Sequence, residues 1–335
     1  MPFVNDVIKQ RSLSIVGLEK NTGKTVCLNY LLKRLSTMSG PSITVTSIGV
    51  DGEQTDSVYA TAKPEITLYD GMRFVTSEKH YLGRQLVSRI VNVDERRTAL
   101  GRLVTADVVA RGKILLSGPS TTEGLQRLIS AQQAAGIDLT IVDGALSRLS
   151  LASPTVTDAL ILATGAAVSP NLQQLVSKTR FVQRLINLPE VPEDTKATLN
   201  NIDSGLWALD NDGVAHDLHI ASAFLVGSDK ELFAYGDTFF SAGAASDRLL
   251  KLLTAHSRPT TLIVRDFTKL FISPDTLASF QRKGGKLLVL QRSNLLAISF
   301  NPTSPQGYRL DSRAACETLA SATGTPVYDV MQCNL

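Results

Sequence analysis

The sequence lacks the features of membrane, secreted and zinc-binding proteins. Its three cysteines (Cys27, Cys316 and Cys333) are far apart and form no Cys-x-x-Cys pair, which argues against a disulfide framework and against a zinc site. No apolar run approaches the roughly 18 residues of a membrane-spanning helix, and the first residues hold no hydrophobic signal core. We therefore expect a cytoplasmic protein that has no membrane partner.

Strong charge of one sign is also missing. The net charge is only +3 at pH 7, and lysines and arginines are scattered along the chain, so nucleic acid is not an expected partner. The 335 residues include 43% hydrophobic and 19% charged side chains. These values are typical of an α/β protein with a sizeable core and with room for two domains. They leave the oligomeric state open.

The most informative segment lies near the start of the chain. Residues 13–16 form a short apolar run that predicts a buried strand, and the run stops at Gly17. From Lys24 onward, leucines recur with helical spacing at positions 28, 31, 32 and 35. The residues between read Asn21-Thr22-Gly23-Lys24-Thr25. A strand, a glycine-containing loop ending in Gly-Lys-Thr and a helix together predict a P-loop, although an ordinary strand–turn–helix corner remains the alternative.

Each residue type in this segment suits a nucleotide. Backbone N–H groups from Gly17 to Gly23, with the partial positive charge of the helix start, would hold phosphate oxygens. Lys24 would reach the β- and γ-phosphates, and the Thr25 hydroxyl would help to hold Mg²⁺. The guanine-reading motif Asn-Lys-x-Asp is absent from the sequence, which favours ATP over GTP. The expected cofactors are ATP and magnesium.

Two acidic positions follow predicted strands. Residues 42–48 predict a second parallel strand, after which come Asp51 and Glu53. Asp51 would hold Mg²⁺ through water or orient the attacking water, with a simple Asp-Gly turn as the alternative. Residues 138–143 place an apolar run before Asp143 and Gly144. We expect Asp143 to be the principal metal-linked carboxylate, with Gly144 allowing close approach to the γ-phosphate. Arg148 is either a charge stabiliser or a surface residue.

The remaining sequence divides into segments of different pattern. Residues 1–190 predict a nucleotide-binding domain with a mostly parallel sheet, and residues 65–112 interrupt it with an antiparallel insertion. Within the insertion, residues 66–76 predict a hairpin that turns at Asp70 and Gly71. A proline-rich and acidic linker begins at Leu188. Residues 200–335 then predict a second, smaller α/β domain.

The pattern resumes after the insertion with a predicted strand over residues 113–119 and a helix to about residue 135. Ser120 and Glu123 have the spacing of a helix capping box. Thr121 and Thr122 leave the predicted carboxyl end of a strand, so a phosphate or substrate contact by either hydroxyl stays open.

Several blocks of the sequence resemble one family. They read GLEKNTGKTVCLNYLL, TSIGVDGE, VDGALSRLSLASPTVTDALILATGAA, NPTSPQG and PVYDV, and they are similar to the smaller, P-loop subunit of the lysine 5,6-aminomutase reactivase. The five residues between Gly17 and Gly23 also resemble the loop of dethiobiotin synthetase. In related ATPases with a signature lysine, that lysine occupies the position of Glu19, whereas this sequence has Lys20 one place later.

The resemblance implies an ATPase that works with a MutS-like partner subunit. Together they would restore an adenosylcobalamin-dependent aminomutase. The chain has no Asp-x-His-x-x-Gly motif, so we expect it not to hold the cobalamin through a histidine. Two alternatives belong to other classes of function. One is a dethiobiotin-synthetase-like ligase or small-molecule kinase, and the other is a nucleotide-sensing scaffold with negligible turnover.

Overall fold

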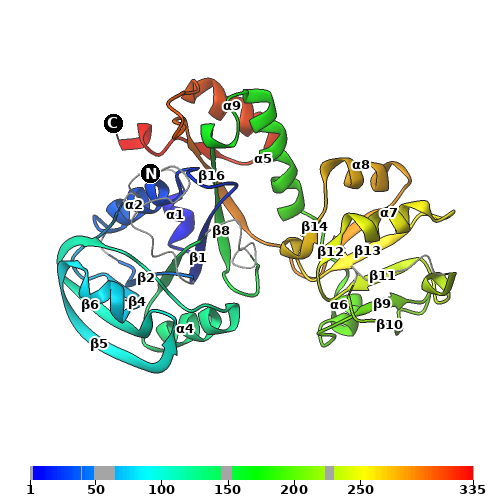
Figure 1. The fold of residues 1–335 in the computed structure, drawn as a ribbon, viewed down its shortest axis with the longest axis horizontal. Helices are drawn as coiled ribbons and strands as arrows, with labels where there is room; N and C mark the ends of the chain where they lie inside the picture. The colour runs from blue at the N-terminus through cyan, green and yellow to red at the C-terminus, as the bar shows by residue number, and fades with distance from the viewer. Residues whose placement is uncertain (1–2, 39, 49–64, 145–152, 223–229, 335) are drawn as a thin grey trace. The chain divides into compact units, whose positions relative to one another are not determined.

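A computed structural model describes residues 3–38, 40–48, 65–144, 153–222 and 230–334 (Figure 1). The chain divides into two compact units. The first comprises Met1–Arg180 and Asn294–Leu335, and the second comprises Phe181–Ser293. None of the described helices has both the length and the apolar character that crossing a bilayer requires.

The first unit is built on a mixed sheet in which the central strands are parallel. Among the described residues its order is β17-β16-β8-β1-β7-β2-β4-β6-β3, and β5 pairs with β6. The seven strands from β17 to β4 run parallel. Their bounds are β1 Ser12–Gly17, β2 Ile43–Ser47, β4 Arg73–Ser77, β7 Leu139–Asp143, β8 Ala159–Gly165, β16 Leu295–Asn301 and β17 Val327–Tyr328. The sequence prediction of an α/β chain with a mostly parallel sheet is confirmed.

The central strands are apolar because both of their faces are covered. Every residue of β1 and of β8 is buried, as expected for parallel strands packed between two layers. The helix α2 spans Lys24–Leu35, as the leucine spacing predicted, and Leu28 and Leu31 join Leu13 of β1 in one core cluster. The other helices of the unit are α1 Val4–Val7, α3 Glu78–Leu82, α4 Thr122–Ala134, α5 Leu172–Ile186, which continues into the second unit, and α9 Ser312–Thr323.

The predicted insertion extends this sheet with antiparallel strands. β6 (Gly101–Ile114) runs antiparallel to β4, to β3 (Ile66–Leu68) and to β5 (Gln85–Thr98). The predicted hairpin over residues 66–76 is wrong, because β3 and β4 both pair with β6 and not with each other. The turn itself is present, and Gly71 adopts a φ of +80° there. The predicted strand over residues 113–119 is also wrong, since β6 ends at Ile114.

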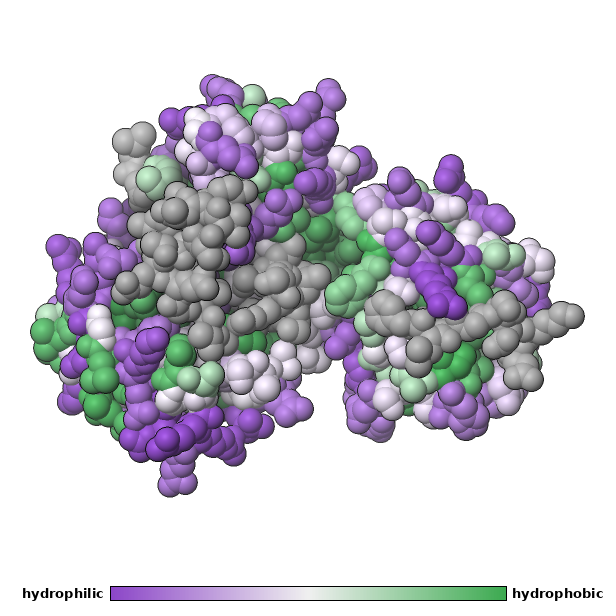
Figure 2. Space-filling view, viewed as in Figure 1, coloured by the Kyte–Doolittle hydropathy of each residue, from purple (hydrophilic) through white to green (hydrophobic). Residues whose placement is uncertain are grey.

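The long hairpin of β5 and β6 has exposed apolar side chains. Its exposed side chains include Val87, Ile90, Val91 and Val109, and Figure 2 shows apolar side chains among hydrophilic ones on this side of the unit. Among the described residues β5 is an edge strand, and an exposed edge strand can pair with another chain. The register between β5 and β6 shifts at four places, and such bulges discourage further strand pairing.

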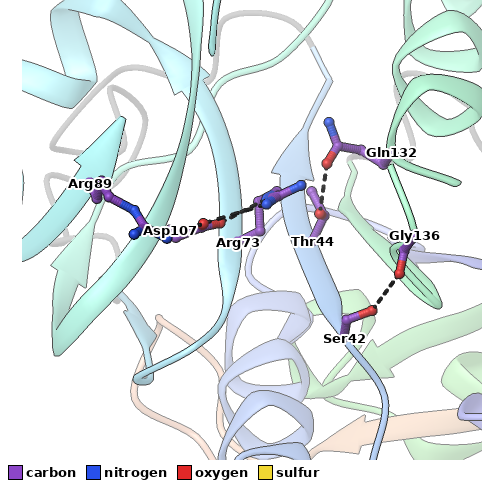
Figure 3. A network of polar contacts seen from close by, with 7 residues as sticks. All are labelled: Ser42, Thr44, Arg73, Arg89, Asp107, Gln132 and Gly136. Atoms are coloured by element: carbon purple, nitrogen blue, oxygen red, sulfur yellow. Dashed lines mark hydrogen bonds and ion pairs between the residues drawn. The ribbon is translucent and has the colours of Figure 1, made fainter. Parts of the chain in front are cut away.

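Ion pairs connect the β5–β6 hairpin to β4 of the sheet. Arg73 on β4 and Arg89 on β5 each lie opposite Asp107 on the intervening β6. The Nε of Arg73 is 2.8 Å from Oδ1 of Asp107, and Nη2 of Arg89 is 3.5 Å from Oδ2 (Figure 3). Nearby, Thr44 donates to Gln132 of α4 at 3.1 Å. The two cross-strand arginine–aspartate pairs help to fix the register of β4, β6 and β5.

The second unit contains a smaller sheet with the order β10-β9-β11-β13-β15. Strands β11, β13 and β15 are parallel, whereas β9 runs antiparallel to both β10 and β11. The bounds are β9 Leu206–Leu209, β10 Ala215–Ile220, β11 Thr238–Ser241, β13 Thr261–Val264 and β15 Lys286–Val289, with helices α6 Glu193–Leu199, α7 Asp247–Ala255 and α8 Pro274–Arg282 and a short pair β12 Ala245–Ser246 and β14 Leu270–Phe271.

The division between the units differs from the predicted one. The sequence places residues 294–335 in the C-terminal domain, but β16 pairs with β8 over most of its length and β17 pairs with β16. The second unit is therefore an insertion that begins within α5 and ends just before β16. β8 pairs with β1 along one edge, and the backbone groups of its other edge pair with β16 from the far end of the chain. A truncation after the linker would remove β16 and β17 from the main sheet.

A buried polar cluster closes the carboxyl end of β4. The Ser117 hydroxyl oxygen accepts a hydrogen bond from the backbone N–H of Ser77 at 3.0 Å, and it lies 3.0 Å from Nδ1 of His80. His80 is only 6% exposed. Burial lowers the pKa of His80, because the charged imidazolium would lose hydration there. Burial therefore favours the neutral form of His80.

We predict that the first unit becomes less stable in mild acid. Below the ordinary histidine pKa of about 6.5, the unfolded chain binds a proton that the folded chain resists, so the free energy of unfolding falls with pH until the lowered pKa is reached. Hydrogen exchange of amides in β1 and β7 at a series of pH values measures this change. His80→Asn should flatten the profile, since the amide nitrogen does not titrate.

The matched control is His219→Asn. His219 is exposed and has a φ of 56°, a conformation that asparagine tolerates. This variant should leave the pH profile of the first unit unchanged. A profile that survives His80→Asn would assign the acid sensitivity to another group.

Candidate functional site

The predicted loop lies between the central strand and a helix. β1 ends at Gly17, and α2 begins at Lys24, so residues 18–23 form the β1–α2 loop. Leu18 donates its N–H to the carbonyl of Ala163 on β8 at 2.9 Å, which attaches the start of the loop to the sheet. Asn21 and Gly23 have φ values of 61° and 90°. Gly23 occupies the N-cap position without a side-chain cap, so the helix start presents its backbone donors to the loop.

Gly17 is required by packing. A Cβ at this position would lie 2.4 Å from Oγ1 of Thr22 and 2.9 Å from Cγ of Lys24, too close for any other residue. Thr22 is fully buried and donates to the carbonyl of Glu19 at 3.0 Å. The missing side chain therefore lets Thr22 and the stem of Lys24 fold over the end of β1. Thr25 follows in the first turn of α2.

Asp143 and Gly144 lie beside this loop. β7 is a direct neighbour of β1, Asp143 is in register with Ile15, and Gly144 donates to the carbonyl of Ile15 at 3.1 Å. Burial raises the pKa of the Cys27 thiol on α2 to about 12, with a lowering contribution from a Ser299 hydrogen bond and a raising one from the charge of Asp143. Asp143 therefore ends a strand that lies directly beside β1, the strand that leads into the loop.

Some predicted positions are elsewhere or are not described. Asp51, Glu53 and Arg148 lie outside the described residues. The predicted capping box is displaced by one residue, because Thr121 and not Ser120 caps α4, accepting from the N–H of Gly124 at 3.1 Å. A pocket of about 430 Å³ is lined by Arg73, Arg89 and Asp107 among others, and contains none of the predicted site residues.

Sequence reasoning missed Asn301. It is the last residue of β16, and its Nδ2 donates to the carbonyl of Asn21 at 3.3 Å. A Cβ on Gly23 would lie 2.8 Å from Cβ of Asn301, so the two residues are in close contact. Tyr308, from the same turn-rich segment, donates its hydroxyl to the carbonyl of Ala166 at 2.7 Å. Residues 301–307 are rich in turn-forming residues, and the sequence leaves them open as a rigid corner or a partner surface. The pairing of β16 with β8 is what places Asn301 at the loop.

A second missed residue is Lys178 on α5. Its Nζ is 3.2 Å from Oε1 of Glu19 in the β1–α2 loop and 3.2 Å from the carbonyl of Val168. The acidic side chain of Glu19 thus makes an ion pair with a neighbouring helix. No sequence pattern indicates this contact.

The residues brought together fit a phosphate-bearing ligand. Any side chain at position 17 would fill the space that Thr22 and Lys24 occupy over Gly17. The start of α2 supplies backbone N–H donors, and Lys24 supplies a cation. Among the described residues, no three His, Cys, Asp or Glu side chains gather as a metal site. A magnesium ion bound chiefly by phosphate and water oxygens needs only one or two protein ligands, and Thr25 and Asp143 suit that role.

Comparisons of the chain with protein-family models, with curated proteins and with solved structures find no match.

Proposed function

We propose that this chain is a Mg-ATP-dependent ATPase of the P-loop class. The observation that carries the proposal is the β1–α2 loop itself, in which Gly17 makes room for Thr22 and Lys24 at the end of a central parallel strand. Asp143 on the adjacent strand supports it. A cation, a helix N-terminus and a neighbouring carboxylate are the parts that phosphoryl transfer to water uses.

The roles of the residues follow from their chemistry. Bound MgATP would supply the γ-phosphoryl group and a divalent cation that offsets phosphate charge. The N–H groups of the β1–α2 loop would hold the phosphates, and Lys24 would offset negative charge that develops as the bond to the γ-phosphate breaks. Thr25 and Asp143 would hold the metal, directly or through water. Asp51 keeps its proposed role as a second metal-linked carboxylate or an orienter of water, and Gly144 would allow close approach to the γ-phosphate.

The proposed use of the energy rests on the family resemblance. The chain would act with a MutS-like partner subunit on an adenosylcobalamin-dependent aminomutase, in the cytoplasm, where its three free thiols (Cys27, Cys316 and Cys333) would remain reduced. The ligase or kinase alternative would use a substrate contact near Thr121 and Thr122. The Thr121 hydroxyl accepts the cap hydrogen bond from Gly124 and keeps its own proton for donation. The scaffold alternative differs only in turnover.

Of the predictions that test the proposed function, the first concerns Lys24. Lys24→Ala should lower ATP turnover at least about tenfold, equal to about 1.4 kcal/mol of lost transition-state stabilisation, because the cation is removed while the backbone cradle remains. Steady-state phosphate release measures the effect. Lys33→Ala is the matched control, since Lys33 is an exposed lysine in the last turn of the same helix. Equal turnover of Lys24→Ala and the unaltered chain would remove the P-loop assignment.

The second prediction concerns the metal. Asp143→Asn should raise the magnesium concentration needed for half-maximal turnover, and it should do so more than Asp51→Asn, because Asp143 ends a buried strand. Magnesium titrations of ATPase activity give the ranking. Asp158→Asn is the control, because Asp158 accepts hydrogen bonds from Arg11 and Ser12 at the amino end of β1. The reverse ranking of Asp143 and Asp51 would exchange their roles.

The third prediction separates the classes of function. A reactivase should hydrolyse ATP slowly alone, below the typical enzyme value of roughly 10 s⁻¹. Adding the MutS-like subunit and an inactivated aminomutase should raise hydrolysis and restore mutase activity. ADP release triggered instead by a small carboxylate, with no recovery of mutase activity, would favour the ligase.

A further inference from the structure

The two connections to the second unit both contact the β1–α2 loop. The chain leaves the first unit through α5, in which the division falls between Arg180 and Phe181, and it returns just before β16. Lys178 lies on α5, and Asn301 ends β16. Each of these two residues touches the loop.

The contact from β16 is the more specific of the two. The amide of Asn301 donates to the carbonyl of Asn21 at 3.3 Å. The same side chain occupies the space beside Gly23, where an added Cβ would lie 2.8 Å from Cβ of Asn301. Asn21 and Gly23 are also the two positions of the loop with positive φ. Asn301 therefore supports the part of the loop whose backbone conformation is least favoured intrinsically.

The contact from α5 is weaker. The Lys178 and Glu19 side chains are 54% and 46% exposed, and exposed ion pairs contribute little because water and salt screen them. Lys178 also donates to the carbonyl of Val168 at 3.2 Å, which holds its ammonium near the loop. We expect Asn301 to carry most of any coupling and Lys178 to add a part that decreases with salt.

We infer that Asn301 and Lys178 are positioning residues that couple the conformation of the β1–α2 loop to the second unit. A ligand that orders the loop acts on both residues, and each belongs to an element that continues covalently into residues 181–293. Suppose that a molecule bound to the second unit changes the affinity of the loop for its ligand. By thermodynamic linkage, that ligand then changes the affinity of the second unit for the molecule by the same factor. The identity of the ligand rests on the proposed function, whereas the coupling does not.

The first experiment uses the full chain and hydrogen exchange read by mass spectrometry. The probe is magnesium with a non-hydrolysable ATP analogue. In the unaltered chain, binding should slow exchange in peptides of the second unit, including α6 and β15, by roughly fivefold. The double variant Asn301→Ala and Lys178→Ala should still bind the analogue, more weakly, and should lose this distant response. Lys178→Arg alone should retain it, since arginine keeps the ion pair.

The control variant is Gln306→Ala. Gln306 lies in the same turn-rich segment, where its side chain contacts Ser304. Removing its amide should leave the response of the second unit intact. A merely structural contribution of the turn would lower the response in this variant as well.

The second experiment needs no nucleotide. Gly23→Ala and Gly71→Ala place a methyl group at φ values of 90° and 80°, so the backbone strain is similar. Only the methyl at position 23 meets Asn301, because nothing lies within 4 Å of a Cβ on Gly71. Gly23→Ala should speed exchange in the second unit by roughly fivefold, and Gly71→Ala should not.

The outcomes separate the coupling from the proposed function. A chain that binds no nucleotide but responds to Gly23→Ala in the second unit keeps the coupling and loses the ATPase. The coupling is overturned by an unchanged second unit in Gly23→Ala, or by a double variant that binds the analogue and responds as fully as the unaltered chain.

Discussion

The close contact of Thr22 and Lys24 with Gly17 sets the position of the whole candidate site. Because position 17 has no Cβ, the loop folds back onto the end of β1 and does not extend away from it. β1 is paired on both sides, with β7 and β8, and all of its residues are buried. The loop therefore has a rigid base, and the residues that surround it come from strands whose ends meet at the same edge of the sheet.

The sequence predicted the parts of this site that depend on local interactions. The strand at residues 13–16 and the helix from Lys24 follow from hydrophobic period, and Asp143 follows from an apolar run that ends in an acid. The sequence also indicated that the loop after β1 and the end of β7 lie at the same edge of the sheet, because parallel strands all end at one edge. The conformation of the loop was less accessible, since the positive φ of Asn21 and the close contact at Gly17 depend on Thr22 and Lys24 packing in three dimensions.

The parts that the sequence did not predict depend on pairing between distant strands. β3 and β4 are separated by a turn that looks like a hairpin, yet β6 lies between them in the sheet. Asn301 reaches the loop only because β16 pairs with β8 after the 113 residues of the insertion, 181–293. The spacing of apolar residues is the same in the strands of both units. It therefore carries no information about which of the two sheets a strand joins. The edge of β8 stays open until β16 has been synthesised, which makes the insertion a matter of folding as well as of function.

The way in which β16 is held limits how a signal can pass along it. Pairing with β8 on one side and β17 on the other prevents β16 from sliding, because a shift of one residue would turn Ile298 and Phe300 from one face to the other. The register with β8 is irregular between Leu295 and Ala297, at the end where the chain arrives from the second unit. Coupling through this strand therefore acts by changing how well its carboxyl end is ordered against Gly23, and not by moving the strand as a rod.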